Sequence, residues 1–307
     1  MINRIINKTI FEKKQLYTDH KPTVSVIVPL FNDEKSIGKV LHSIQKQTYE
    51  NWECLVIDDG SNDSGPQIVS EIGRSDHRIS LLRVGYNSGR PAVPRNIGIR
   101  NSKGSIIAFL DADDWWYSRK LEYAVGAHLD GADVVYHHLR KFDWQHGYTK
   151  TGRSIKESSR VLALPLSDIN SYDELLFGRN ALPNSSVTVW KEKLVEIDLI
   201  DESPDLRAIE DYDTWLRLAE NGVRFVRLPL SLGIYSVNAG NITESHLLSE
   251  KRLSMYRRQR FRQDPRLANG TYWVQTARRR PVIFLRHVLS ILRKFGFAAL
   301  IEVFGDE

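Results

Sequence analysis

A chain of 307 residues is long enough to bury one large core or two smaller ones. Its hydrophobic content of 41% and charged content of 26% are those of an ordinary globular protein, and its single cysteine, Cys54, excludes an intrachain disulfide and a cysteine-based zinc site. The net charge of +5 conceals an asymmetry, because the segment from Lys251 to Lys294 holds thirteen lysines and arginines against one acid, Asp264. The basic character therefore belongs to the C-terminal segment.

The N-terminal 22 residues contain no apolar core long enough for a signal peptide. No later segment reaches the roughly 18 uncharged apolar residues that a membrane span needs. We therefore expect a cytoplasmic protein that is either soluble or peripheral on a membrane.

Strands and helices alternate regularly through the first part of the chain. Short apolar runs predict strands, and apolar residues at helical spacing after Ser36 predict a helix that this serine caps. The predicted elements in chain order are a strand over 23–30, a helix from 37, a strand in "ECLVIDDGS", a helix around 65–72, a strand over 78–84, a short helix in "RPAVPRNIGIRNS" and a strand in "SIIAFL". This order is typical of an α/β fold with a mainly parallel sheet flanked by helices.

The second part of the chain is less regular. It predicts strands in "ADVVYHHL", "SSVTVW", "VRFVRLP" and "SLGIYSV", and a helix in "IEDYDTWLRLAENG" that Gly222 closes. The polar stretch that follows Lys141 is expected to be a hairpin or a mobile loop. We divide the chain into an N-terminal arm (1–22), one α/β domain (23–245) and a basic helical extension (246–307).

Acidic residues follow two of the predicted parallel strands. Asp111, Asp113 and Asp114 end one strand in "FLDADDWW", and Asp58 and Asp59 end another. Because ligands of such sheets bind beyond the carboxyl ends of the strands, we expect both groups in one crevice. Aspartates two positions apart suit a hard cation such as Mg²⁺ or Mn²⁺. The alternative is that Asp111 and Asp114 cap the helix expected near residue 118.

Two further residues could do chemistry at the same crevice. Arg95 follows "PAVP" and suits the recognition of phosphate or carboxylate, although an ordinary surface arginine explains it equally. Asp211 shares a helix face with the apolar Trp215 and Leu218, so partial burial would raise its pKa towards that of a useful general base. The alternative is that the acids in this first turn only complement the helix dipole.

Two common nucleotide-binding motifs are absent from the sequence. The turn after the first strand is "PLFNDE", which lacks the glycines of a Rossmann fingerprint, and the chain contains no P-loop. A metal-dependent phosphatase or nucleotidyltransferase could still use the acidic cluster, and so could a non-catalytic binding protein.

In the order of its motifs the chain resembles the family 2 glycosyltransferases. The resemblance rests on "VSVIVPLFNDEKSIGKVLHSIQKQTYENWECLVIDDGSND", on "PRNIGIRNSKGSIIAFLDADDWW", and on "SSVTVW" followed by "IEDYDTWLRLAENG", and it covers about residues 23–243. It implies the GT-A fold, a nucleotide-diphospho-sugar donor and a reaction that inverts the anomeric centre.

The resemblance also implies a role for individual positions. Asp211 matches the general base, Glu210 of the same pair is the second catalytic candidate, and Asp113 matches the carboxylate that binds Mn²⁺ or Mg²⁺. The positions that match donor-binding residues are Pro29, Phe31 and Glu34 at the nucleoside, Asp59 at the base (usually uracil), Arg95 near the nucleotide and Asp111 at the ribose.

One segment departs from the family pattern. Many relatives carry Y-R-x-H-x-x-N-x-S after the sheet, whereas this chain reads "YSVNAGNIT", with Ser236 in place of the arginine and Asn238 in place of the histidine. We therefore expect weaker metal binding, or binding that depends more on phosphates and water. His246 is an alternative ligand.

The basic extension mixes cationic residues with an apolar stripe that includes Leu285, Leu289 and Leu292. This pattern is typical of a helix that binds a membrane surface, and the alternatives are a helix packed on the domain or a dimer contact. Nucleic-acid binding is not expected, because it explains the charge but not the stripe. The resemblance implies transfer of a sugar from a UDP-sugar, and together with the basic extension it implies a lipid-linked or cell-surface polysaccharide acceptor at the inner face of the cell membrane.

Overall fold

The computed structural model describes the central part of the chain and a few residues of the C-terminal extension. The described residues are 21–143, 160–161, 163, 166, 171–177, 180, 182–237, 255–256, 259–260, 285, 288–289 and 292. Most of the predicted arm, the polar stretch over 144–159, Asn238 and His246 lie outside them, so the domain boundaries stay predictions.

The core of the fold is a nine-stranded sheet in the order β3-β2-β1-β4-β8-β6-β9-β5, with β7 paired to β6. Six of the nine strands (β1 to β4, β6 and β9) run in one direction, and β5, β7 and β8 run in the other. The strands span Val24–Leu30 (β1), Trp52–Asp58 (β2), Ile79–Arg83 (β3), Ile106–Phe109 (β4), Trp115–Trp116 (β5), Val134–Asp143 (β6), Arg160–Val161 (β7), Thr188–Trp190 (β8) and Phe225–Val237 (β9). The predicted α/β fold with a mostly parallel sheet is confirmed.

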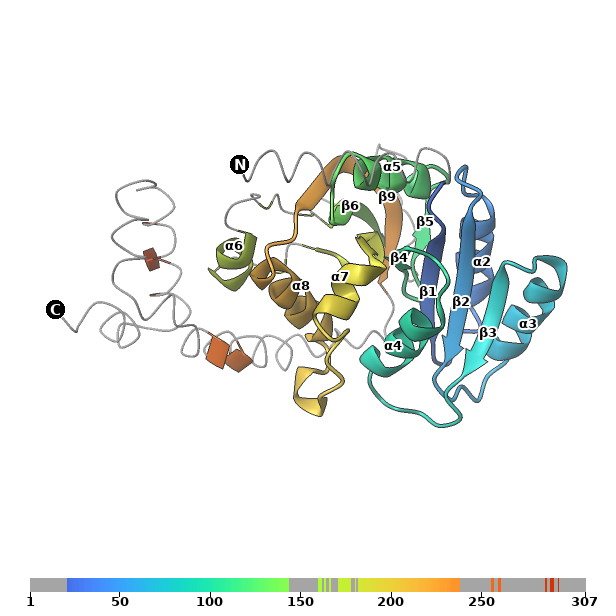
Figure 1. Ribbon diagram of the computed structural model, residues 1–307. Helices are drawn as coiled ribbons and strands as arrows, with labels where there is room; N and C mark the ends of the chain where they lie inside the picture. The colour runs from blue at the N-terminus through green and yellow to red at the C-terminus, as the bar shows by residue number, and fades with distance from the viewer. Residues whose placement is uncertain are drawn as a thin grey trace.

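Helices cover both faces of this sheet (Figure 1). Their bounds are Ile37–Gln45 (α2), Gly65–Ser75 (α3), Ala92–Asn101 (α4), Lys120–Leu129 (α5), Ser171–Phe177 (α6), Lys191–Glu196 (α7) and Glu210–Glu220 (α8). Alternate residues of β1 explain the two layers, because Val26 and Val28 belong to the core under α2, α3 and α5, whereas Ile27 belongs to the core under α4 and α8.

The last long strand differs from the prediction. Phe225–Val237 forms one strand, β9, where the sequence indicated two. Its pairing with β6 passes from His137 opposite Leu228 to His138 opposite Ser231, so Pro229 and Leu230 form a bulge. Proline cannot donate a ladder hydrogen bond, and the bulge lets the strand continue past it.

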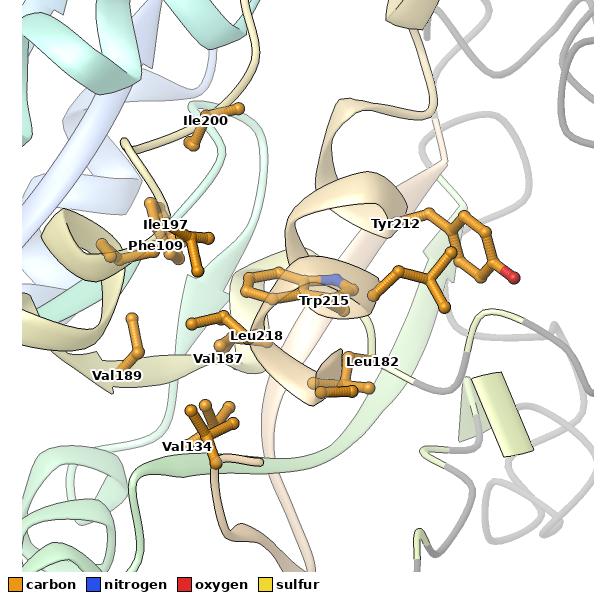
Figure 2. Close-up of a cluster of buried hydrophobic side chains, with 14 of the residues drawn as sticks. Phe109, Val134, Leu182, Val187, Val189, Ile197, Ile200, Tyr212, Trp215 and Leu218 are labelled. Carbon is orange, nitrogen blue, oxygen red and sulfur yellow. The ribbon is translucent and has the colours of Figure 1, made fainter. Parts of the chain in front are cut away.

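The helix that carries the Glu210–Asp211 pair is fixed by packing. Trp215 of α8 is 1% exposed and meets Phe109 of β4 edge to face, with ring centroids 6.0 Å apart and an interplanar angle of 63°. Figure 2 shows this indole among the side chains of Val187, Leu182 and Leu218. Because Phe109 ends its strand two residues before Asp111, the packing sets the start of α8 beside the acidic cluster.

The few described residues of the extension contact the same helix. The Tyr256 hydroxyl donates to the Asp213 carboxylate, and Arg260 pairs with Glu220 at 2.6 Å. At these residues the extension packs on the domain, which was one of the predicted alternatives. Among the described residues, no helix is both long enough and apolar enough to cross a membrane.

Replacing Trp215 with alanine is expected to lower the free energy of unfolding by about 3–5 kcal/mol, since it removes a large buried side chain and leaves a cavity. Denaturant unfolding followed by circular dichroism measures the change. Val195→Ala is the control, because Val195 is 58% exposed and its truncation is expected to change stability by less than about 0.5 kcal/mol. A similar loss in both variants would contradict the packing described for α8.

Candidate active site

The loops after β1 and β2 are locked together at the carboxyl edge of the sheet. The Glu34 N–H donates to Asp63 at 2.8 Å, and the Ser64 N–H donates back to the Glu34 carboxylate at 3.0 Å. Pro29 lies inside β1 opposite Ile57, and Phe31, 43% exposed, lies just beyond the strand. Glu34 therefore holds the shape of the first loop, and Phe31 is open to a ligand.

Asp59 lies buried at the end of β2. Its two carboxylate oxygens accept the Ser88 N–H at 3.1 Å and the Ser88 hydroxyl at 2.8 Å, which fixes the loop before α4. The next residue, Gly60, has a φ of +80°, and a Cβ there would come within 2.7 Å of the backbone of Tyr86 and Asn87. This turn therefore requires glycine at position 60.

Arg95 joins the acidic cluster to the start of α8. It is 6% exposed, and its Nη2 donates to Asp111 at 2.7 Å while its Nη1 donates to Glu210 at 2.9 Å. Gly98, one helical turn later, brings α4 close to the sheet, because a Cβ there would lie 2.7 Å from the side chains of Ile27 and Ile57. The alternative of a surface arginine is wrong.

Asp114 has a different role from its neighbours. It is 1% exposed, and its carboxylate accepts the Ser236 N–H of β9 at 2.8 Å. The alternative that Asp111 and Asp114 cap the following helix is wrong, because α5 begins at Lys120 after Arg119 and has no side-chain cap. Asp114 instead attaches the turn after β4 to the distant strand β9.

Asp113 has a raised pKa and no cationic partner among the described residues. Burial, followed by the charges of Asp111 and Asp33, raises its pKa to about 7, and burial also raises the pKa of Asp33. No lysine or arginine of the described residues pairs with Asp113. A divalent cation would offset the repulsion between the carboxylates of Asp113, Asp111 and Asp33, so these residues fit a divalent cation.

The protein's own ligands for such an ion are few. Among the described residues, no three His, Cys, Asp or Glu side chains are grouped so that they could hold a metal ion. Mg²⁺ and Mn²⁺ commonly keep waters and substrate phosphates as ligands. The arrangement therefore suits an ion that binds together with a diphosphate.

Asp211 has the electrostatics of a general base. Burial, followed by the charge of Glu210, raises its pKa to about 7, although the nearby Arg95 opposes this shift. The Asn180 amide donates to its Oδ2 at 3.3 Å. On another face of α8, Asp213 pairs with Arg217 at 2.7 Å, and this i,i+4 ion pair supports the helix.

Several residues that contact these carboxylates have no recognisable signal in the sequence. Asn184 donates to Asp111 at 3.0 Å, the Ser185 hydroxyl accepts the Asp111 N–H at 3.1 Å, and Asn180 reaches Asp211. Asp33 was visible only as part of the first loop. None of these side chains has a recognisable spacing, because tertiary contacts from other segments bring them to the site.

The fold and the site together define a class. A mostly parallel sheet places a base candidate, a cation candidate and a loop with an exposed aromatic residue at one edge. This arrangement suits an enzyme that binds a phosphorylated ligand beyond the strand ends and moves a proton there.

Comparison with known proteins agrees with that class. Residues 25–178 match the sequence model of the family described as Glycosyl transferase family 2. TuaG of Bacillus subtilis, named as a teichuronic acid biosynthesis glycosyltransferase, is 30% identical over 210 residues, which are 67% of this chain and 75% of that protein. The chain belongs to glycosyl transferase family 2 and is a nucleotide-sugar glycosyltransferase.

Two further similarities are informative. The Escherichia coli UDP-Glc:alpha-D-GlcNAc-diphosphoundecaprenol beta-1,3-glucosyltransferase WfaP is 27% identical over 72% of this chain and 79% of its own. The structure of a mannosyltransferase from Pyrobaculum calidifontis, in complex with GDP-Man and Mn²⁺, aligns with a TM-score of 0.59 over 99% of this chain and 98% of that chain. At 16% identity, the second similarity shows the fold alone.

Replacing Asp113 with asparagine is expected to stabilise the metal-free protein at pH 8. The folded-state pKa of Asp113 is raised from 3.8 to about 7, so the wild-type protein loses stability as pH rises between these values. The variant escapes this loss and gains on the order of 1 kcal/mol, since solvent access weakens the effect.

Thermal unfolding in a chelator measures this gain, and Glu50→Gln, an exposed change away from the cluster, is the control. Addition of Mn²⁺ with UDP should raise the melting temperature of the wild type but not of the Asp113 variant. An equal increase in both would exclude Asp113 as the ligand.

Proposed function

We propose that the protein is an inverting, metal-dependent hexosyltransferase that moves a sugar from a UDP-sugar to a hydroxyl of a lipid-linked or cell-surface polysaccharide acceptor. The observation that carries the proposal is the placement of Asp211 and Asp113. Both carboxylates have a pKa of about 7, and Arg95 links the strand end before Asp113 to the helix turn that holds Asp211. We assign the base to Asp211, at the start of α8, and the cation ligand to Asp113, beside Asp111 and Asp33.

In the proposed reaction, Asp211 accepts the proton of the acceptor hydroxyl, and the oxygen of that hydroxyl attacks the anomeric carbon. The diphosphate leaves from the opposite face of the sugar, so the anomeric centre inverts and no covalent enzyme intermediate forms. Asp113 would hold Mn²⁺ or Mg²⁺, which would offset the charge on the leaving diphosphate.

The donor is proposed to lie along the edge formed by the first three loops. Phe31 offers an exposed ring to the nucleoside beside Pro29, and Glu34 maintains the loop that presents them. Asp59 faces the base and Asp111 the ribose. Arg95 acts on the donor through its ion pair with Asp111.

The acceptor is proposed from the relatives and from the charge of the extension. WfaP is named for a diphosphoundecaprenol-linked acceptor, and such a lipid lies at a membrane. The thirteen basic residues between 251 and 294 would attract an anionic membrane surface, and the exposed Leu285 and Leu289 add apolar contact. The enzyme would then work on the cytoplasmic side as a peripheral protein.

Asp211→Asn is expected to lower kcat by about 10²–10⁴-fold with little change in UDP affinity, because it removes the proton acceptor and leaves the donor edge intact. A radiolabelled UDP-sugar assay with a lipid-linked acceptor measures the transfer. Asp205→Asn, an exposed acid shortly before α8, is the matched control and should keep full activity. Release of labelled phosphate without sugar transfer would favour a phosphatase instead.

The rate should also depend on pH with a defined sign. Asp211 works as a base only when ionised, so kcat should rise about tenfold per unit below its pKa of about 7 and level off above it. Initial rates at saturating donor between pH 5 and 9 test this profile. A rate that falls over this range as pH rises would contradict the assignment of the base.

Changing Arg278, Arg279 and Arg280 together to glutamine should weaken binding to anionic vesicles about 100-fold, since each basic residue near such a surface contributes about 1 kcal/mol. Sedimentation with vesicles of phosphatidylglycerol and phosphatidylcholine measures the affinity, and pure phosphatidylcholine is the control. Equal binding of wild type and variant would show that these charges do not dock the protein.

A further inference from the structure

We propose that Arg95 is a positioning residue that fixes the first turn of α8 to the donor-side carboxylate Asp111, so that one buried guanidinium sets the spacing between the donor and the base Asp211. This inference rests on the proposed function and assigns new roles within that site. It also makes Glu210 the anchor of the base rather than a second catalytic group.

The geometry of Arg95 connects three elements that are distant in sequence. Arg95 comes from α4, Asp111 follows β4 and Glu210 opens α8, 115 residues after the arginine. The two terminal nitrogens of the guanidinium each hold one carboxylate, at 2.7 and 2.9 Å. A planar guanidinium can hold two carboxylates in fixed directions, whereas a lysine ammonium cannot reproduce that fork.

The burial of this network argues against a direct role in donor binding. Arg95 and Glu210 are each 6% exposed, and both terminal nitrogens of the arginine are already occupied by carboxylates. The Nε donor is also buried and has no hydrogen-bond partner among the described residues. The side chain of Asp111 is 31% exposed, so this carboxylate can contact a ligand while Arg95 holds it from behind.

The same burial assigns a role to Glu210. Its Oε1 accepts from Arg95, and the residue directly precedes Asp211 in the first turn of α8. A fixed Glu210 therefore fixes the backbone from which the base projects. Removal of Arg95 would leave two carboxylates uncompensated, one of them buried, and their repulsion from Asp211 would move the turn.

A neighbouring residue ties α4 to the segment that leads into α8. The Asn96 amide donates to the Ile200 carbonyl at 2.7 Å and to the Glu202 carboxylate at 2.8 Å, and its oxygen accepts the Ile200 N–H at 3.1 Å. Trp215 packs the middle of the helix against Phe109. These contacts fix the approach to α8 and its middle, and the Arg95 pair fixes its first turn.

The test compares Arg95→Lys and Glu210→Gln with Arg217→Gln, which removes an ion pair of similar length on α8 that Arg217 forms with Asp213. Arg95→Lys is expected to lower kcat about 100-fold, because a shift of about 1 Å in a catalytic group has that effect, while the Kd of UDP with Mn²⁺ stays within about threefold. Arg217→Gln should lower thermal stability and leave kcat unchanged. Added guanidinium should partly restore kcat of Arg95→Ala but not of Asp211→Asn.

Hydrogen exchange gives a readout that does not need turnover. The amides of residues 209–213 should exchange faster in Arg95→Lys and Glu210→Gln, and should be unchanged in Arg217→Gln. Unchanged exchange in the first two variants overturns the inference, and so does an Arg95→Lys enzyme whose UDP affinity falls while kcat is preserved. A wild-type protein that transfers no sugar, but shows the expected exchange pattern, would overturn the proposed function and leave the positioning role standing.

Discussion

Negative charge collected at one edge of the sheet is the constraint around which this site is organised. Asp111, Asp113, Glu210 and Asp211 converge there from two segments about a hundred residues apart, and Arg95 is the cation that the fold supplies to them. One guanidinium cannot balance four carboxylates. Burial, together with this excess of negative charge, raises the pKa of Asp113 and of Asp211 to about 7.

The packing of the domain makes that convergence possible. The two faces of the sheet carry separate cores, and the site lies where elements of one of them, α4 and α8, approach the end of β4. Gly98 lets α4 lie close enough for Arg95 to reach past the strand, and Trp215 against Phe109 sets the position of α8. Stability and function therefore depend on the same contacts, so core substitutions near Phe109 are expected to disturb the site.

The three aspartates of the acidic cluster differ in burial and in their partners. Asp114 is buried and connects the turn to Ser236 of β9. Asp111 is partly open and held by Arg95, and Asp113 has no ion-pair partner among the described residues. The three neighbouring aspartates therefore differ in the partners that the fold brings to each, and only Asp114 has a purely structural contact; the ligand role of Asp111 and the cation role of Asp113 are the ones we propose.

The sequence by itself determined the order of strands and helices in the first part of the chain, the acidic strand ends and the family, because periodicity and local motifs record contacts close in sequence. It failed at β9, where two apparent strands join through a bulge at Pro229, and it left open whether Arg95 lay on the surface. Only the tertiary structure decided that Arg95 is buried between Asp111 and Glu210. Ion pairs across 16 and 115 residues leave no spacing in the sequence, since their free energy depends on burial and distance that exist only once the sheet has formed.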